Sequence, residues 1–593
     1  MSKKLIFAIS ALVSATLFAS KPIALNLIHI NDHHSHLEPS VVNMKIDGVK
    51  TKVKIGGYPE MVGIIKELKK TKTNPIVLHA GDAITGTLYF TLFGGSADAD
   101  LMNVTGLDYF TLGNHEFDAG NEGLKKFLDY LKVPTISANV NPDKGSILEN
   151  YWKPYAIKEI DGEKIGIIGL DVVKKTVNSS SPGKDIKFVD EIEASEKYVK
   201  ELQAMGIDKI ILLSHAGAEK NFEIAQKVSG IDVIITGDTH YLFGNDSLRE
   251  LGLPVKSEYP TVFRSPSNEP VVVVEAWSYS QIVGDLEVQF NEDGLITKIK
   301  AQPLIPYHTN YFERKDNNGK KYNPKGKELQ AILNKLDGNP YFVRAKADKV
   351  AAEILSKYEK QKKSLGGEVV GKLVGESMPG GSENRIPNKD NPKGSVATRF
   401  IAETMLTQMR SFGENAHIDL TIQNSGGVRA NIEPGVMTYN DAYTILPFGN
   451  TLVLMKLTGA EIKQVLEDAI DFASTNSTGA FPYGAGIRYE ANQYKDANGK
   501  RLVKVEIQDA KTGAWSLIDE SKEYVVGTNA YIAGGKDGYA TFGKIFKERG
   551  AEDTFLPDAE SLIKFMKLNP EFKTYSDSNV IFHYDAKNPI NKK

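Results

Sequence analysis

The sequence contains no cysteine among its 593 residues. This absence excludes disulfide bonds, thiolate metal ligands, a cysteine nucleophile and an N-terminal cysteine that carries a lipid. The protein must therefore rely on packed cores, and its 41% of hydrophobic residues provides enough material for more than one core. Any metal ion would be held by nitrogen and oxygen atoms alone.

Long hydrophobic runs are also lacking, except near the first residue. Lys3 and Lys4 precede an apolar run over residues 5–18, and the small residues Ala19 and Ser20 follow it. This pattern predicts a secretory signal peptide over residues 1–20, because the run is too short for a stable membrane span. The alternative is a buried N-terminal helix. No second run of this kind occurs, so we expect an exported, periplasmic protein without a membrane anchor.

Neither sign of charge is in excess. The sequence has 72 lysine and arginine residues against 75 aspartate and glutamate residues, which gives a formal net charge of -3. This balance provides no long-range attraction to nucleic-acid polymers or to anionic membranes. We therefore expect small-molecule partners bound at a local site. The oligomeric state is left open.

Short apolar segments alternate with helical patterns through the first half of the chain. The predicted strands are rich in isoleucine and valine, as buried strands are; they span residues 23–30, 76–79, 109–112, 165–170, 210–213, 233–235 and 271–275. Helical patterns at 58–70 and 191–205 lie between them. This alternation predicts an α/β fold for a first domain over residues 21–342. We expect the polar segment 310–337 to be an insertion or surface loop.

The pattern changes after residue 342. Residues 348–363 have a helical pattern in which Val350, Ile354 and Leu355 share one face, and Gly366 and Gly367 follow it. We therefore expect a linker helix within residues 343–367. Beyond the linker, strands, helices and many glycine-containing turns predict an α+β domain over residues 368–593.

Polar residues follow five of the predicted strands in the first domain. In an open α/β sheet, ligands collect where the strands end. By the two-residue period of a strand, Asp32 and His34 point the same way and His33 points the opposite way. The candidate metal ligands are Asp32, His34, Asp82, Asn114, His215, Asp238 and His240. We expect His33, His36 and His79 to be supporting or structural.

Carboxylate, imidazole and amide groups without sulfur suit zinc, manganese, magnesium or similar ions. Each motif alone has an ordinary alternative, since Asp-x-His is often a polar loop and Gly-Asp is often a turn. Seven candidates exceed the three or four ligands that one ion needs, so we predict two divalent ions that share a bridging carboxylate. Ions in such pairs lie about 3.5–4 Å apart. They stabilise both the attacking oxygen and the leaving oxygen when phosphorus undergoes an in-line displacement.

The order of these motifs resembles the calcineurin-like metallophosphoesterase pattern: Asp32-x-His34, Gly81-Asp82, Gly113-Asn114-His115-Glu116, His215 and Gly237-x-x-His240. Their spacing is similar to that of the 5′-nucleotidase family, in which such a domain precedes a nucleotide-binding domain. The resemblance covers nearly all of the chain after residue 20 and implies a four-layer α/β/β/α first domain. Residues 81–95, 176–185 and 481–486 point to the branch of periplasmic NAD nucleotidases of the Haemophilus type.

The resemblance also implies roles for the ligands. One ion would be held by Asp32, His34 and His240, the other by Asn114, His215 and Asp238, and Asp82 would bridge the two. The ions would be zinc, with manganese, magnesium or cobalt as alternatives. His115 is similar to the histidine that stabilises the transition state, and Asp118 would orient its ring. Asp238 departs from the pattern, since most relatives have histidine there, and this departure leaves the choice of metal open.

Three loops of the second domain are candidates for nucleotide binding. Residues 423–429 (QNSGGVR) combine two glycines with an arginine, 446–450 (LPFGN) place an aromatic ring in a turn, and 529–538 (NAYIAGGKDG) contain a ring and an acid. Each loop also fits an ordinary packed turn or hairpin. The resemblance implies that the rings of Phe448 and Tyr531 enclose the base and that Asp537 holds the ribose. It assigns the remaining base and phosphate contacts to Arg385, Asn424 and Arg429.

These observations predict an exported, metal-dependent phosphoester hydrolase. A hydroxide held by the ions would attack phosphorus in line, without a covalent intermediate. NAD would be cleaved at its pyrophosphate to AMP and nicotinamide mononucleotide, and nucleoside 5′-monophosphates would lose phosphate. The alternatives are a UDP-sugar hydrolase and 5′-nucleotidase of broad specificity, or a nucleotide-binding receptor without turnover.

Overall fold

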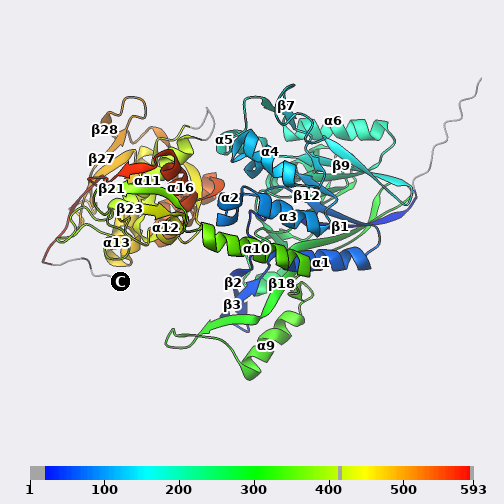
Figure 1. The fold of residues 1–593 in the computed structure, drawn as a ribbon, viewed down its shortest axis with the longest axis horizontal. Coiled ribbons are helices and arrows are strands. Elements are labelled where there is room, and N and C mark those ends of the chain that lie inside the picture. Colours follow the sequence, from blue (N-terminus) through cyan, green and yellow to red (C-terminus); the bar gives the residue numbers. More distant parts are fainter. Residues whose placement is uncertain (1–20, 412–416, 588–589, 591–593) are drawn as a thin grey trace, which may run out of the picture.

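The computed structural model describes residues 21–411, 417–587 and 590, so the predicted signal peptide over residues 1–20 lies outside the described residues. The chain forms two domains that lie beside each other, the N-terminal domain on the right of Figure 1 and the C-terminal domain on the left. Among the helices of the described part of the chain, none is long and apolar enough to cross a membrane.

Two β-sheets form the centre of the N-terminal domain. The first has the strand order β2-β3-β18-β17-β1-β4-β5-β6, and the second has the order β15-β16-β12-β11-β9-β8. The strands of the first sheet along this order are β1 (Ile23–Ile30), β2 (Ser40–Ile46), β3 (Val49–Ile55), β4 (Pro75–His79), β5 (Tyr109–Thr111), β6 (Thr135–Ile136), β17 (Val283–Phe290) and β18 (Ile296–Lys315). Two short strands, β19 (Lys321–Tyr322) and β20 (Phe342–Arg344), pair with β18 outside this order. The second comprises β8 (Tyr155–Ile160), β9 (Glu163–Leu170), β11 (Lys209–Ser214), β12 (Val233–Thr236), β15 (Thr261–Arg264) and β16 (Pro270–Glu275). All seven predicted strands are therefore confirmed.

The side chains of β1 alternate between two cores, as the pleat of a strand requires. Leu25 and Leu27 pack with residues of the second sheet, whereas Ile28 and Ile30 pack under helices. Helices α1 (Tyr58–Thr71), α3 (Ser96–Thr105) and α4 (Gly120–Tyr130) cover the first sheet, and α6 (Glu191–Ala204) and α7 (Ala218–Lys227) cover the second. The layers follow one another as α/β/β/α, which confirms the predicted architecture.

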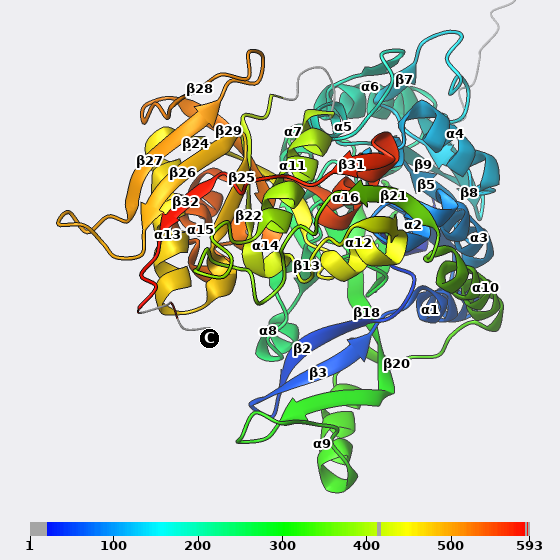
Figure 2. The same cartoon turned by 60° about the vertical axis from the view of Figure 1, so that its left-hand side comes forward.

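Of the two alternatives predicted for residues 310–337, an insertion or a surface loop, the loop is wrong. Strand β18 continues to Lys315, and residues Gly326–Asp337 form helix α9. Ile332 and Leu336, four residues apart on that helix, are buried in a separate small core with strands β2 and β3. The many lysine and asparagine side chains of the segment cover the outer surface of this extension, which projects below the domain in Figures 1 and 2. The polar composition of this segment therefore did not reveal that it contains an ordered helix.

The helical pattern predicted over residues 348–363 is confirmed as α10 (Lys349–Leu365), which Asp348 caps by accepting a hydrogen bond from the Ala351 amide at 3.0 Å. Leu355 is buried in the core under α1 and α3, whereas Val350, predicted on the same face, is 49% exposed because it lies in the first turn. Helix α10 therefore packs on the N-terminal domain. The chain passes into the second domain beyond its C-terminal end.

A five-stranded sheet with the order β25-β22-β29-β24-β30 divides the C-terminal domain into two cores. Its strands are β22 (Leu420–Asn424), β24 (Thr451–Thr458), β25 (Pro482–Ala485), β29 (Glu523–Asn529) and β30 (Glu552–Pro557). Helices α11 (Val396–Arg410) and α16 (Asp558–Leu568) pack on one face, and α13 (Gly459–Thr475) and α15 (Ala540–Arg549) pack on the other. The predicted α+β domain is confirmed.

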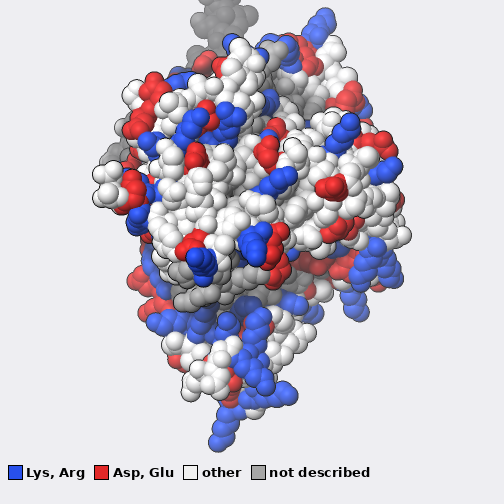
Figure 3. All heavy atoms as spheres, turned by 90° about the vertical axis from the view of Figure 1, so that its left-hand side faces the viewer, with Lys and Arg blue, Asp and Glu red and all other residues white. Residues whose placement is uncertain are grey.

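Basic and acidic side chains are interspersed over the face of the C-terminal domain that Figure 3 presents. Opposite charges that lie close together cancel at a distance. The attraction of a phosphate group must therefore depend on local groups at the site itself.

Candidate active site

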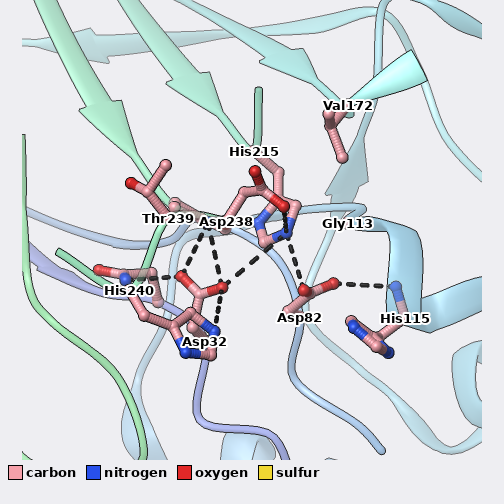
Figure 4. A network of polar contacts seen from close by, with 12 residues as sticks. Asp32, Asp82, Gly113, His115, Val172, His215, Asp238, Thr239 and His240 are labelled. Atoms are coloured by element: carbon pink, nitrogen blue, oxygen red, sulfur yellow. Dashed lines mark hydrogen bonds and ion pairs between the residues drawn. The ribbon is translucent and has the colours of Figure 1, made fainter. Parts of the chain in front are cut away.

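The carboxyl ends of strands from both sheets meet at one place, which Figure 4 shows from close by. The loops after β1 and β4 are joined by a hydrogen bond from the Asp32 amide to the Gly81 carbonyl at 3.0 Å. The loop after β16 joins them, because the Tyr279 amide donates to the Asp32 carbonyl at 2.8 Å. The side chains carried by these loops are thus fixed by main-chain contacts.

Five of the seven predicted metal ligands have a left-handed backbone, which is uncommon for residues other than glycine. They are Asp32, His34, Asp82, Asp238 and His240, with φ angles between 47° and 80°. Such strain persists only where the surrounding structure imposes it, and it gathers at functional sites. Backbone conformation thus marks the same residues that the sequence motifs selected.

Atoms of the candidate ligands lie close together, although several of them bear the same negative charge or an unshared electron pair and therefore repel one another. His34 Nε2 is 3.0 Å from His240 Nε2, and His240 Nε2 is 3.3 Å from Asp32 Oδ1. His215 Nε2 lies 2.9 Å from Asp82 Oδ2. Donors from Asp32, Asp82 and His215 fall within 4.8 Å of one another, as do those from Asp32, His34 and His240. The two groups share Asp32, and Asp82 Oδ2 also lies 3.6 Å from His34 Nε2, so Asp82 faces both groups. This arrangement fits a site for two ions.

Buried atoms without a hydrogen-bond partner test whether metal ions fit these residues. His215 donates its Nδ1 proton to the Ala80 carbonyl at 2.7 Å, which leaves Nε2 as an acceptor that faces Asp82. His215 Nε2, Asp82 Oδ2 and Asn114 Oδ1 are all buried without a hydrogen-bond partner. Buried acceptors that face one another are costly unless a cation lies between them. The donor set therefore fits divalent metal ions.

Asp238 has a contact that the sequence motifs did not reveal. Its Oδ1 lies 3.9 Å from His215 Nε2 but only 2.7 Å from the ammonium group of Lys175, on helix α5 (Val173–Ser179). The Asp238 amide also donates to both carboxylate oxygens of Asp32 at 3.1 Å. Lys175 is more than 60 residues from Asp238 in the chain, so no local spacing could have linked the two.

His115 and Asp118 form the pair that the sequence predicts. His115 Nδ1 lies 2.5 Å from Asp118 Oδ2, while its Nε2 is buried without a partner. Burial lowers the pKa of His115, but the carboxylates of Asp118 and Asp82 outweigh it and raise the pKa to about 9. Donors from His34, Asp82 and His115 also fall within 4.8 Å of one another. Geometry alone thus fits His115 either as a charge-stabilising group or as a ligand.

Glu116 joins two of the loops that carry these residues. Its carboxylate accepts hydrogen bonds from the amides of Gly113 at 2.7 Å, Ala83 at 2.9 Å and Asp82 at 3.0 Å. Gly113 is required there, because a Cβ atom would collide with the Asp82 carboxylate. Glu116 therefore links the loop that carries Asp82, the candidate bridging ligand, to the turn that carries His115, the candidate catalytic residue.

Two aromatic residues at the centre were missed by the sequence analysis. Tyr279 follows β16, and its ring centroid lies 5.1 Å from that of His240; the rule that ligands collect at strand ends could have found it. Phe555 comes from β30 of the other domain and stacks on His240 at 4.1 Å, with 23° between the ring planes. It has a left-handed φ of 53°. No local signal in the sequence links Phe555 to the metal centre.

The predicted nucleotide-binding residues gather at one edge of the C-terminal sheet. Asn424 ends β22 and donates to Asp537 Oδ2 at 3.3 Å, and the Tyr531 hydroxyl donates to Asp537 Oδ1 at 3.0 Å. The Arg429 guanidinium lies 5.5 Å from the centre of the Phe448 ring. Arg385 is close enough to Asp537 and Arg429 for both to influence its pKa, which burial lowers. All six residues thus belong to one neighbourhood.

Comparisons with known proteins agree with this arrangement. A model of the calcineurin-like phosphoesterase family matches residues 25–242, and a model of the 5′-nucleotidase C-terminal domain matches residues 369–544. The NAD 5′-nucleotidase of Haemophilus influenzae is 56% identical over 584 residues, which cover 98% of this chain and 96% of that protein. A probable 5′-nucleotidase of Treponema pallidum is 56% identical over 559 residues, 94% of each chain.

Solved structures show the same likeness. The structure of the Haemophilus influenzae NAD nucleotidase matches with a TM-score of 0.91 at 56% identity, covering 95% of this chain and 100% of that one. A 5′-nucleotidase precursor from Thermus thermophilus matches with a TM-score of 0.55 at 31% identity, over the same shares of the two chains. The likeness therefore extends over both domains.

Proposed function

The chain belongs to the 5′-nucleotidase family of metal-dependent nucleotide hydrolases, and we propose that it cleaves the pyrophosphate of NAD and then removes phosphate from the resulting 5′-monophosphates. The observation that carries this proposal is a divided site. A buried cluster of metal-ligating groups lies in one domain, and aromatic and acidic groups suited to a nucleoside lie in the other. The relatives named for NAD are similar over the whole of this arrangement.

The metal ligands in this proposal are Asp32, His34, Asp82, Asn114, His215, Asp238 and His240. Two divalent ions, when bound, supply positive charge to the phosphoryl oxygens and lower the pKa of water to produce the nucleophile. Zinc suits the imidazole-rich part of the set, and manganese, magnesium and cobalt suit its oxygens. Asp82 lies near His34 and His215, which belong to different groups of donors, so it would be the ligand shared by the two ions.

His115 acts on the phosphoryl group in this mechanism. Asp118 holds the proton on Nδ1 and fixes the ring, so that Nε2 is directed to the reacting centre. A protonated Nε2 donates a hydrogen bond to a phosphoryl oxygen on which charge develops. The carboxylates around the ring favour this charged form.

The C-terminal domain binds the nucleoside part. Phe448 and Tyr531 are 57% and 44% exposed, and Arg429 lies over the Phe448 ring, so the ring surface that remains exposed is open to a base. Asp537 accepts hydrogen bonds from the ribose hydroxyls, and Arg429 and Arg385 attract the phosphates. The adenosine half of NAD can bind here, and AMP and nicotinamide mononucleotide can bind in the same way.

Turnover requires the two domains to move in this proposal. Phe555 stacks on His240 in the present arrangement, where a phosphate would have to approach the metal centre. Rotation of the C-terminal domain beyond α10 would withdraw Phe555 and bring the bound nucleotide to the metals. We further propose that the protein is exported by its N-terminal segment to the periplasm and converts NAD, which crosses membranes poorly, into nucleosides for salvage.

A time course from pure NAD tests the reaction. AMP and nicotinamide mononucleotide are expected to rise first and then fall, while adenosine, nicotinamide riboside and inorganic phosphate appear later. An excess of chelator is expected to stop both steps and to lower the melting temperature, because bound ions stabilise only the folded protein. Free nicotinamide as the first product would contradict pyrophosphate cleavage. Full activity after long incubation with chelator would contradict the metal mechanism.

A crosslink across the domain interface tests the movement. The Thr91 hydroxyl donates to Glu560 of the other domain at 3.0 Å, so the side chains at these positions meet across the interface. Because the chain has no cysteine of its own, a short bifunctional maleimide can link only the two cysteines of the double variant T91C/E560C within one molecule. The linked protein is expected to lose turnover, while the unlinked double variant and each single variant stay active. Undiminished turnover in the linked protein would reject domain movement.

A further inference from the structure

Lys175 is a charged group at the metal centre that the proposed mechanism does not use. Its side chain is only 20% exposed and its ammonium group lies 2.7 Å from Asp238 Oδ1. The same nitrogen lies 4.8 Å from the centre of the Phe555 ring. Its neighbour Lys174, by contrast, points outward and is exposed. The short helix α5 thus directs one of two consecutive lysines to the metal ligands.

The charges at the centre indicate what this contact does. Asp32, Asp82 and Asp238 contribute three negative charges, whereas two divalent ions contribute four positive ones. The remainder is a single positive charge, which is a weak attraction for a phosphate that carries two negative charges. Lys175 adds one more positive charge within hydrogen-bonding distance of a ligand, where water is largely excluded and charges interact strongly.

We propose that Lys175 offsets the negative charge of the ligand Asp238, so that the metal centre keeps its affinity for phosphate. This inference rests on the proposed function only in that Asp238 is a metal ligand. It does not depend on which nucleotide is the substrate. The role is distinct from a contact with the substrate, because Lys175 acts through Asp238.

Charge balance has a signature that a purely structural role lacks. A positive group beside the ligands repels metal ions and attracts phosphate. Replacing Lys175 with methionine is therefore expected to leave zinc retention unchanged or increased and, at the same time, to weaken phosphate binding about tenfold. Loss of local structure would instead weaken both.

Calorimetric titration of inorganic phosphate into the zinc-loaded protein measures this effect without turnover, and elemental analysis after dialysis against a zinc buffer measures retention. Lys175→Arg is expected to bind phosphate as the parent does, since it keeps the charge. Lys174→Met is the matched control and should change neither quantity. Because no NAD is used, failure of the NAD assignment leaves the result interpretable.

A double-mutant cycle separates action through Asp238 from direct contact. In an Asp238→His background Lys175 has no carboxylate to keep its ammonium group beside the ligands, so the side chain can turn to solvent, where water and salt screen its charge. Adding Lys175→Met should then change phosphate affinity by less than about twofold. Asp238→Asn provides a second neutral background if the histidine variant folds poorly. An equal loss of phosphate affinity in all backgrounds would show that Lys175 contacts phosphate and would overturn the proposal. Unchanged phosphate binding in Lys175→Met, or a parallel loss of zinc, would overturn it as well.

Discussion

The metal centre and the nucleotide-binding surface are built in opposite ways. The candidate ligands of the metal centre are buried, apart from the partly exposed His240, and are held by strained backbone, by main-chain hydrogen bonds and by the Glu116 carboxylate. The candidate stacking residues Phe448 and Tyr531 are exposed and belong to the other domain. Under the proposed roles, the groups that perform chemistry are fixed before substrate arrives, whereas the groups that recognise the nucleoside remain open to solvent. In the proposed function, the domain movement connects the two.

Asp82→Ala is expected to have the largest effect, and it tests whether the metal centre depends on this one residue. Because Asp82 faces both groups of donors, its loss should impair both ion sites and reduce turnover by about 10⁴-fold or more. Elemental analysis should find fewer than two ions per chain. Binding of AMP, measured in the absence of turnover, should persist through the C-terminal domain. An ordinary metal content would show that Asp82 does not bridge.

His115→Ala should separate chemistry from metal binding within the same centre. We expect turnover to fall by about 10²–10⁴-fold with two ions retained, since His115 is proposed to stabilise charge and not to hold metal. Turnover and metal content are measured on the same preparation. Asp118→Asn, which keeps the shape of the partner, should cause a smaller loss. If His115→Ala instead loses an ion, then the cluster with His34 and Asp82 is a ligand set.

Changes to the rings test the recognition side. Phe448→Ala or Tyr531→Ala should each raise the KM for AMP by about 5–150-fold, which corresponds to the loss of one stacking contact of about 1–3 kcal/mol. Hydrolysis of a phosphoester without a base should be unaffected, since the metal centre is untouched. Tyr531→Phe should lose only the hydrogen bond to Asp537. Equal losses on both substrates would mean that these rings do not select the nucleoside.

The smallest expected effect concerns the contact that links the two regions. Phe555→Ala removes the ring that stacks on His240, and ring pairs contribute about 0.5–1.5 kcal/mol. Zinc should then be removed by a chelator about 2–10-fold faster, which a colorimetric chelator can follow over time. Phe555→Leu keeps an apolar side chain over the centre, so its rate of zinc removal should lie between the rates of the parent and of Phe555→Ala. A rate equal to that of the parent would show that the ring does not shield the metal centre.

The metal centre was largely predictable from the sequence because its residues sit at strand ends, where topology brings distant segments together. Asp32 and His34 follow from the general rule for α/β sheets. The two-residue period does not apply to them, because β1 ends at Ile30 and both residues have a left-handed backbone. The rule for α/β sheets could also have found Tyr279, at the end of β16. The roles of these residues came from the family resemblance and stay predictions.

The residues that the sequence did not reveal act across long separations. Lys175 meets Asp238 from a helix without a recognisable motif, and Phe555 reaches His240 from the other domain. Neither contact has a local spacing that could signal it. The extension formed by β18 and α9 was missed for a different reason: its polar composition concealed two apolar residues on one helical face, Ile332 and Leu336.

The Glu116 carboxylate has a consequence for how the protein inactivates. It holds the loop of Asp82 and the turn of His115 through the same few hydrogen bonds. Heat or chemical damage that releases one of these segments therefore releases the other. A partly inactivated sample should consist of fully active and fully inactive molecules in varying proportion, with KM unchanged as the maximal rate declines.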